Sequence, residues 1–151
     1  DKYAKNGDLD AFTFGIPKVK GLDFSFSGLK TSILYFIQKE MAKNPSFIKD
    51  YRNDLCASIQ NSIVKILIDK LEKSIIQTGI NQIAIAGGVS ANSFLRMRLK
   101  ELADQKEYDL YIPKFEFCTD NAAMIAIAGY YKMVNMDFGS QDEIASARLA
   151  F

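Results

Sequence analysis

Two short apolar segments, residues 83–86 and 108–112, constrain the fold more than any other feature of the sequence. The first is closed by Gly87-Gly88 and the second by Pro113, and a helical pattern follows each of them. The order strand, helix, strand, helix predicts a parallel α/β unit. A sheet of only two strands is marginal, because three or more are normally needed. We therefore expect an α/β, helix-rich fold that holds a short two-strand parallel element and only part of a larger sheet.

Long helical patterns precede this unit. Ser27 is the expected N-cap of a helix that ends before Asn44. A longer helical stretch, over about 45–78, has an apolar residue at every fourth position, so its apolar stripe winds around the helix. That stretch is therefore either buried on several sides or broken in two. Gly79 supplies its C-terminal stop.

Two further helices are expected after the strands. The first, over about 91–105, is amphipathic, with leucines inward and three basic residues largely outward (Arg96, Arg98 and Lys100). The second runs from residue 119 or 120 to about 134, and its side chains are small and apolar on every side. We expect this last helix to be packed closely on several neighbours.

The two ends of the chain differ in character. Residues 1–22 contain glycines and a proline that break any period, so we expect an irregular lead-in there and a partial lobe over 23–151. So long an approach without strands is better explained by a cut within a longer protein. The exposed sheet edges and uncovered apolar helix faces of a partial lobe predict that the chain self-associates.

Composition narrows the chemistry. The chain has no histidine, which removes the commonest metal ligand and the commonest general base. Its net charge of +1 shows no basic excess of the kind that neutralises nucleic-acid phosphates. Two cysteines are too few for a disulfide framework, and no apolar run approaches the ~20 residues of a membrane helix. A cytoplasmic setting without membrane contact is expected.

Three segments contain residues of the kinds that bind ligands. The turn from Gly87-Gly88 to Asn92 lies between a strand and a helix, where glycines and free N–H groups can cradle a nucleotide. A tight connection with Ser90 as helix cap explains the same turn equally well. Asp120 follows the second strand, where α/β sheets usually bind ligands, and is either a metal ligand or a residue that complements the helix dipole.

The third segment, residues 23–31, alternates phenylalanine and serine before it enters a helix. This alternation suggests an extended stretch with one buried face, and Lys30 with the hydroxyl groups is able to face a phosphate. The pattern alone favours a structural role.

Taken in order, these segments resemble one family. DFSFSGLKT at 23–31, AGGVSAN at 86–92, CTDNAAMIA at 118–126 and SAR at 146–148 look like the C-terminal signatures of the TsaD/Gcp proteins, the tRNA adenosine threonylcarbamoyltransferases once labelled glycoproteases. Each motif is weak alone, but four in this order are specific. The resemblance implies part of the C-terminal lobe of an actin-like ATPase fold, in which two RNase H-like lobes surround a nucleotide cleft.

The resemblance also implies an activity and a site. The family transfers threonylcarbamoyl from threonylcarbamoyl-adenylate to the N6 amine of the adenosine beside the anticodon, in tRNAs that read codons beginning with A. By position, Asp120 matches a metal ligand, Asn92 matches an asparagine that contacts the nucleotide, and Gly87-Gly88 match the turn beside it. The implied cofactors are one divalent metal ion, of the iron or zinc type, and threonylcarbamoyl-adenylate or ATP. The implied partners are tRNA and accessory proteins of the TsaB and TsaE type.

The family's paired histidine ligands and its glycine-rich phosphate loop have no counterpart in this chain, so we expect the chain alone to be inactive. Three alternatives stay open: a metallopeptidase, another nucleotide-dependent enzyme of the actin-like superfamily, or a non-catalytic helical interaction module. The lack of histidine argues against a zinc peptidase. The Asp120 segment and the phenylalanine–serine alternation favour the transferase over a sugar kinase.

Overall fold

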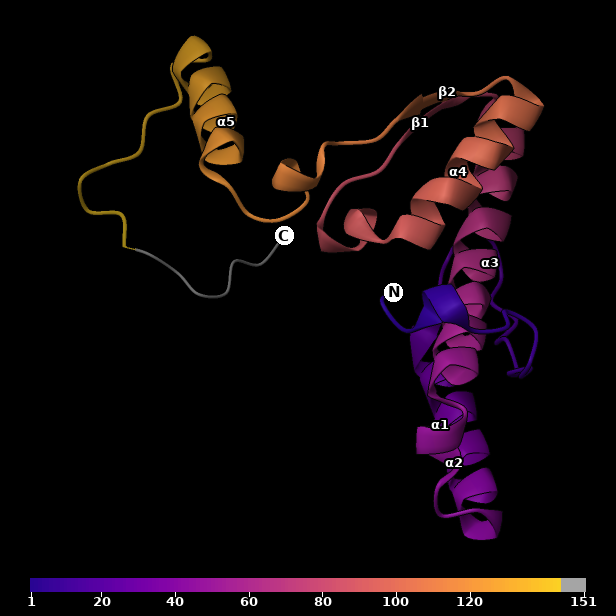
Figure 1. The fold of residues 1–151 in the computed structure, drawn as a ribbon. Coiled ribbons are helices and arrows are strands. Elements are labelled where there is room, and N and C mark those ends of the chain that lie inside the picture. Colours follow the sequence, from indigo (N-terminus) through magenta and orange to yellow (C-terminus); the bar gives the residue numbers. More distant parts are fainter. Residues whose placement is uncertain (145–151) are drawn as a thin grey trace.

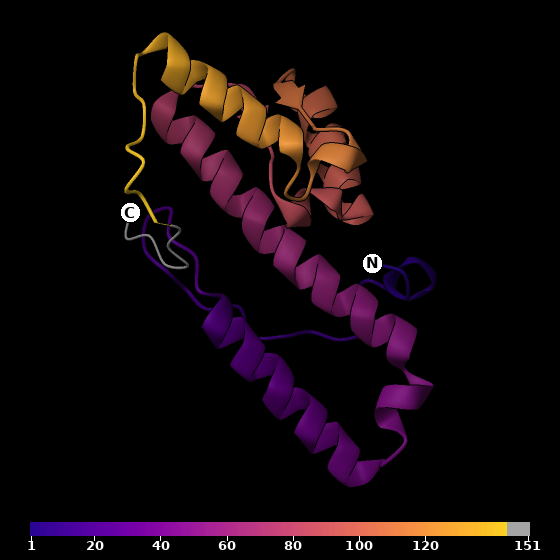
Figure 2. The same cartoon turned by 90° about the vertical axis from the view of Figure 1, so that its left-hand side faces the viewer.

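The computed structural model describes residues 1–144 and consists mainly of helices (Figures 1 and 2). Its longer elements are α1 (Phe26–Lys43), α2 (Phe47–Asp50), α3 (Arg52–Thr78), β1 (Gln82–Ala84), α4 (Ser93–Lys106), β2 (Asp109–Tyr111) and α5 (Ala122–Val134). Three short 3₁₀ helices accompany them: η1 (Ala4–Asn6), η2 (Gly88–Ala91) and η3 (Phe115–Phe117). Within this part of the chain no helix combines the length and apolar character that crossing a membrane requires. The motif at 146–148 lies outside the described residues.

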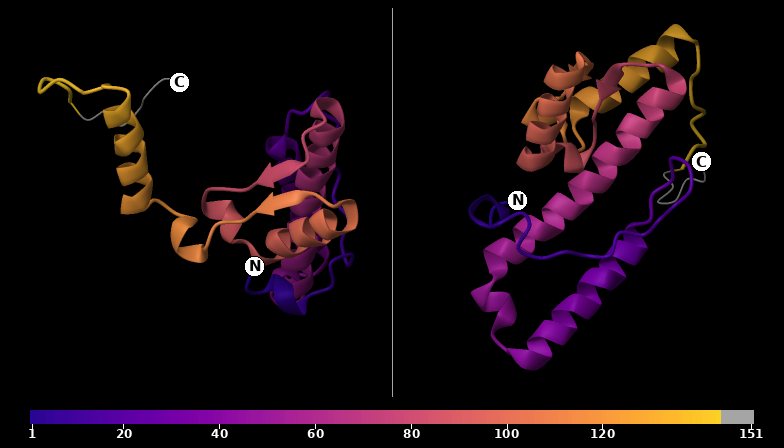
Figure 3. Two further views of the ribbon diagram at one scale, coloured as in Figure 1. Left: turned by 90° about the horizontal axis from the view of Figure 1, so that it is seen from above. Right: turned by 90° about the vertical axis from the view of Figure 1, so that its right-hand side faces the viewer.

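The predicted α/β unit is confirmed. Strands β1 and β2 pair in parallel, with Gln82 opposite Asp109 and Ala84 opposite Tyr111, and α4 connects them (Figure 3). Each strand has three residues, fewer than predicted. The unit packs on α3 through an apolar cluster centred on three buried side chains: Val64, Leu95 and Leu99.

The break predicted as one option for the 45–78 stretch is present. Tyr51 separates α2 from α3 with a backbone conformation of φ −111° and ψ 23°, outside the helical range. The chain reverses direction earlier, between the end of α1 at Lys43 and the start of α2, so α1 lies beside the first half of α3 (Figure 2). A second apolar cluster fills the space between them, with buried Phe14, Leu29, Leu55 and Ile66. Gly79 ends α3 in the left-handed conformation, φ 70°, as predicted.

Two expectations at the start of α1 are wrong. The helix begins at Phe26, so Ser27 lies inside it instead of capping it, and its carbonyl accepts a hydrogen bond from the Thr31 hydroxyl. The phenylalanines of the 23–31 segment do not form a buried face either. Phe24 and Phe26 stack on one another at 5.7 Å and remain about half exposed. The reason is that entry into the helix at Phe26 ends the alternation of faces that an extended strand would have produced.

Within residues 1–22 the chain forms one short 3₁₀ helix, η1, and it is bound firmly to α3. The Ser58 hydroxyl, fully buried, accepts a hydrogen bond from the Phe12 N–H and donates one to the Asp8 carbonyl. Asn61 donates to the Leu9 carbonyl, and Lys70 Nζ donates to the carbonyls of Val19 and Gly21 at 3.0 and 2.6 Å. A helix whose buried polar side chains satisfy the backbone of another segment holds that segment without any strand pairing.

The prediction that the last helix is packed on several neighbours is wrong for the described residues. None of the side chains of α5 is buried, and Figures 1 and 3 show the helix standing apart from α3 and α4. An apolar surface on every side of a helix indicates that the helix becomes buried, but it does not identify the element that covers it. Here both apolar clusters are filled by other elements, and residues 112–121 lead the chain away from them.

The anchoring of the lead-in can be tested with Lys70→Met. Lys70 is only 8% exposed, and its loss leaves two backbone carbonyls without their donor. We expect the free energy of unfolding in urea to fall by about 2–3 kcal/mol.

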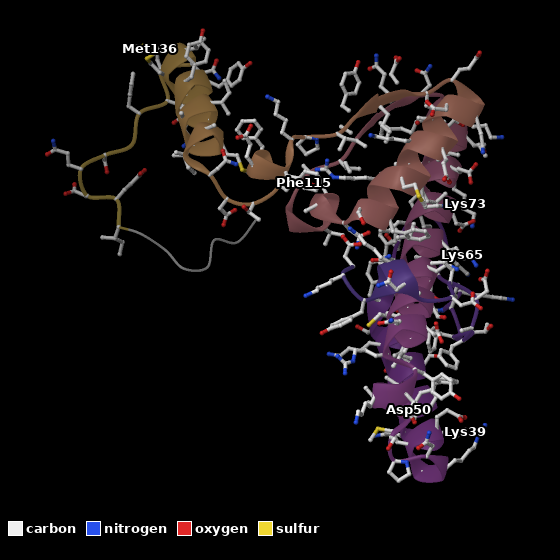
Figure 4. The ribbon with its side chains drawn as sticks, in the orientation of Figure 1. Lys39, Asp50, Lys65, Lys73, Phe115 and Met136 are labelled. Atoms are coloured by element: carbon white, nitrogen blue, oxygen red, sulfur yellow. The ribbon has the colours of Figure 1, made fainter. Side chains whose placement is uncertain are left out.

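Lys65→Met on the same helix is the matched control. Lys65 is exposed, as Figure 4 shows, and within residues 1–144 its one ion pair is with the exposed Asp10 of the lead-in at 3.2 Å. The change should be about 0.5 kcal/mol or less. Equal losses in the two variants would show that Lys70 does not anchor the lead-in.

Candidate functional site

The turn after β1 requires glycine at one position. Gly87 has φ 80° and ψ 175°, a conformation that residues with a Cβ essentially never adopt. Gly88 has no positive φ, and a Cβ built on it meets nothing within 4 Å. The turn is closed by Ser90, which is 2% exposed and whose hydroxyl donates to the Gly87 carbonyl at 2.6 Å. Gly87 and Gly88 themselves are exposed, so a ligand can reach their backbone.

Asn92, and not Ser90, is the cap of α4. Its side-chain oxygen accepts a hydrogen bond from the Leu95 N–H at 2.9 Å, and its amide nitrogen donates to Gln60 of α3 at 2.8 Å. The Ser93 N–H is also taken, because it donates to the Asp1 carboxylate at 3.1 Å. The free N–H groups expected at this helix start are therefore partly occupied, and the exposed glycines remain the open part of the turn.

An apolar cavity of about 440 Å³ adjoins this turn. Phe24 of the first motif and Val89 and Ser90 of the second line it, together with residues of α3, β1 and α4. The structure thus brings two of the three motif segments to one cavity. Lys30 is exposed on α1 and is not among the lining residues.

Asp120 lies in the loop that precedes α5 and is exposed. The cap of α5 is Asn121, whose side-chain oxygen accepts from the Met124 N–H at 3.1 Å. Within residues 1–144 the Asp120 carboxylate forms no hydrogen bond or ion pair with another side chain or the backbone, so it is not the helix cap.

A metal site is not complete in the described part of the chain. No group of three or more Cys, Asp and Glu side chains gathers there, and histidine is absent from the sequence. Asp120 supplies one oxygen donor, which suits a divalent metal but does not form a site by itself. The chemistry of the donor set therefore does not support any step through a metal within this chain.

Sequence reasoning missed Arg96. It was expected to point largely outward, but it is half-buried and contacts both segments that follow the strands. Its guanidinium donates to the carbonyls of Ser90 and Pro113 and to Cys118 Sγ. The amphipathic pattern placed Arg96 on the polar side of α4, and only the fold shows that the two loops cover that side.

The fold and the turn define a class: an α/β unit with parallel strands and an exposed, glycine-dependent turn at the carboxyl end of the first strand. Comparison with known proteins specifies it further. The family model described as TsaD, tRNA N6-adenosine threonylcarbamoyltransferase, matches residues 1–127, and the chain belongs to this family.

Curated relatives with that name extend the match over the whole chain. One from Christiangramia forsetii is 53% identical over 151 residues, which are 100% of this chain and 44% of the relative. One from Riemerella anatipestifer is 53% identical over 148 residues, 98% of this chain and 43% of the relative. One from Cytophaga hutchinsonii is 47% identical over 149 residues, 99% and 43%. The chain thus spans less than half the length of these relatives.

The two glycines of the turn can be separated by mutation. Gly87→Ala places a Cβ in a conformation that strongly disfavours it, so the free energy of unfolding should fall by about 1–3 kcal/mol. Gly88→Ala is its matched control, because the added Cβ meets open space. We expect a change of about 0.5 kcal/mol or less there. Urea unfolding measures both, and a loss at Gly88 as large as that at Gly87 would contradict the assigned turn geometry.

Proposed function

We propose that this chain is part of a tRNA N6-adenosine threonylcarbamoyltransferase, and that it contributes one wall of the site for the nucleotide of the donor. The observation that carries the proposal is the family match over residues 1–127, together with 53% identity to a named transferase across the whole chain. The pair of parallel strands connected by α4 is consistent with part of the C-terminal, RNase H-like lobe of an actin-like ATPase fold.

In the proposed reaction, the N6 amine of adenosine attacks the carbamoyl carbonyl of threonylcarbamoyl-adenylate. A C–N bond forms, the bond from that carbon to the phosphate oxygen of AMP breaks, and the amine loses a proton. The barrier falls when the two reactants are held in line and when charge that develops on oxygen meets fixed donors. The chain's own part is to bind and orient the adenylate at the turn after β1.

The turn suits this task in two respects. Gly87 and Gly88 leave their backbone open to close approach. The Asn92 side chain is held by hydrogen bonds with Leu95 and Gln60. The first uses one lone pair of its oxygen, and the second uses one of its two N–H groups. One N–H and one oxygen lone pair remain available, in a side chain whose orientation is already fixed. We therefore assign Asn92 to the nucleotide.

We assign Asp120 to the family's metal ion. Its carboxylate is exposed and uncommitted within residues 1–144, and it follows β2 at the edge where open α/β sheets bind ligands. The metal would polarise the reacting carbonyl or phosphate oxygen. Further ligands would come from parts of the longer relatives that this chain does not match, and the tRNA, TsaB-type and TsaE-type contacts belong to the same longer protein.

The alternatives differ in what they require. A zinc peptidase needs a ligand set that residues 1–144 do not contain. A sugar kinase or a helical interaction module has no support from the names of the curated relatives, which are those of a transferase. The exposed apolar side chains of α5 agree with self-association of the isolated chain, which stays a prediction.

The 151-residue chain alone should show no transfer, because one wall of a cleft cannot hold donor and acceptor in line. The assay combines the purified chain, threonylcarbamoyl-adenylate and tRNA, and measures modified adenosine by mass spectrometry. The full-length transferase is the positive control. Modified adenosine formed by the chain alone would refute the proposal that the site needs a second wall.

Asp120→Ala in the full-length transferase should lower metal content and transfer together. We expect a loss of at least about tenfold in metal affinity or activity, as is typical when a support of a metal site is removed. Asp104→Ala is the control, because Asp104 is also exposed but lies in the last turn of α4, outside the segment that carries Asp120. If Asp120→Ala changes neither quantity, Asp120 is not a ligand.

A further inference from the structure

We propose that Arg96 is a positioning residue that holds the nucleotide turn and the loop carrying Asp120 in a fixed relation to one another. This inference rests on the proposed function. It adds a residue to which no role in the site is otherwise assigned. The turn follows β1 and the loop follows β2, so contacts between the two segments are needed to fix the distance between them. In this structure one guanidinium contacts both.

The first contact fixes the nucleotide turn. Arg96 Nε donates to the Ser90 carbonyl at 2.5 Å. Ser90 is buried, and its hydroxyl and its N–H both donate to the Gly87 carbonyl, at 2.6 and 3.0 Å. The backbone N–H of Arg96 itself donates to the Asn92 carbonyl at 3.1 Å. Arg96 is therefore bonded to the turn at its closed end and at its exit into α4.

The second set of contacts fixes the loop. Arg96 Nη2 donates to the Pro113 carbonyl at 2.8 Å and to Cys118 Sγ at 3.1 Å. Cys118 is 2% exposed, and the guanidinium carbon lies 4.0 Å from the centre of the Phe115 ring. Figure 4 shows Phe115 where the chain leaves β2 toward α5. The contacts thus cover the loop from its start at Pro113 to two residues before Asp120.

Arginine is required for this arrangement. Its planar fork directs Nε and Nη2 toward acceptors on two different segments, and its face stacks on an aromatic ring. A lysine ammonium in the same place keeps the charge but is a single point that cannot span both segments. Hydrogen bonds from a charged donor to partly buried acceptors are also stronger than neutral ones.

A merely structural role predicts a different behaviour. If Arg96 only stabilised the fold, Arg96→Lys would lower the unfolding temperature, and at a temperature where the variant is fully folded it would leave binding and catalysis unchanged. If Arg96 positions the two segments, the folded variant binds the nucleotide less tightly and transfers more slowly. The readouts are therefore binding and the separate values of KM and kcat, measured below the unfolding transition.

The experiment uses the full-length transferase with Arg96→Lys, and Arg98→Lys as the matched control. Arg98 lies two residues along the same helix and is exposed, where it pairs with Glu101 at 3.1 Å. Calorimetry with AMP measures the nucleotide site, and steady-state transfer to tRNA gives KM for threonylcarbamoyl-adenylate and kcat. We expect Arg96→Lys to weaken AMP binding about tenfold and to lower kcat about tenfold, by analogy with other outer-shell partners. Arg98→Lys should match the wild type in both.

Cys118→Ala tests the contact with the loop separately from the contact with the nucleotide turn. It also tests the proposal if Arg96→Lys does not fold. It removes one contact of Arg96 with the loop and leaves those with Pro113 and Phe115, so kcat should fall by less than in Arg96→Lys while AMP affinity stays within about twofold. Arg96→Lys and Cys118→Ala should also be non-additive in kcat, because they break one contact.

The outcomes separate this inference from the proposed function. An inactive wild type, or Asn92→Ala with unchanged AMP affinity, would overturn the proposed function. An active wild type with Asn92→Ala impaired, together with an Arg96→Lys variant that equals Arg98→Lys in AMP affinity and kcat, would overturn the role of Arg96 alone. A Cys118→Ala variant with wild-type kcat would overturn the part of that role assigned to the Cys118 contact.

Discussion

Helix α3 is the constraint on which the rest of the structure depends, because both apolar clusters include its residues. Leu55 and Ile66 belong to the cluster shared with α1, and Val64 belongs to the one shared with the α/β unit. Between them, buried polar side chains satisfy the backbone of the lead-in. A helix that must face apolar neighbours on two sides and a polar backbone on a third cannot show one simple apolar stripe. This is why the apolar positions in its sequence wind around the helix.

The position of the glycine turn depends on this helix. Gln60 of α3 binds the amide of Asn92, and Asn92 in turn caps α4 and ends the glycine turn. The turn is therefore placed by a chain of contacts that begins in the core. Within residues 1–144 the Asp120 side chain has no such contact with α3. Its position follows from the loop, to which Arg96 donates hydrogen bonds at Pro113 and Cys118. The two halves of the proposed site thus differ in how they are held, and in our proposal the guanidinium of Arg96 fixes one relative to the other.

Local patterns predicted the parts of the fold that depend on nearest neighbours. Gly79 ends α3, the strand–helix–strand order gives a parallel pair, and the leucines of α4 face inward, all as expected. The errors lie where distant segments meet. Arg96 was placed outward because periodicity does not show which loops cover a polar face, and α5 was expected to be buried because composition does not show what is available to cover it. The N-cap of α1 was missed by two residues, Ser27 in place of Ser25, a usual uncertainty at helix ends.

The amino-acid sequence by itself determined the family, through ordered motifs that no fold was needed to read, and it determined which residues are candidates for the site. It also determined that Gly87 and Gly88 lie in a turn between a strand and a helix. Only the tertiary structure decided how those candidates are held. The hydrogen bonds that Lys70 and Arg96 donate to remote backbone carbonyls, and the one that Ser58 accepts from a remote backbone N–H, leave no periodic pattern in the sequence. Each joins residues that are neighbours in space and not in sequence.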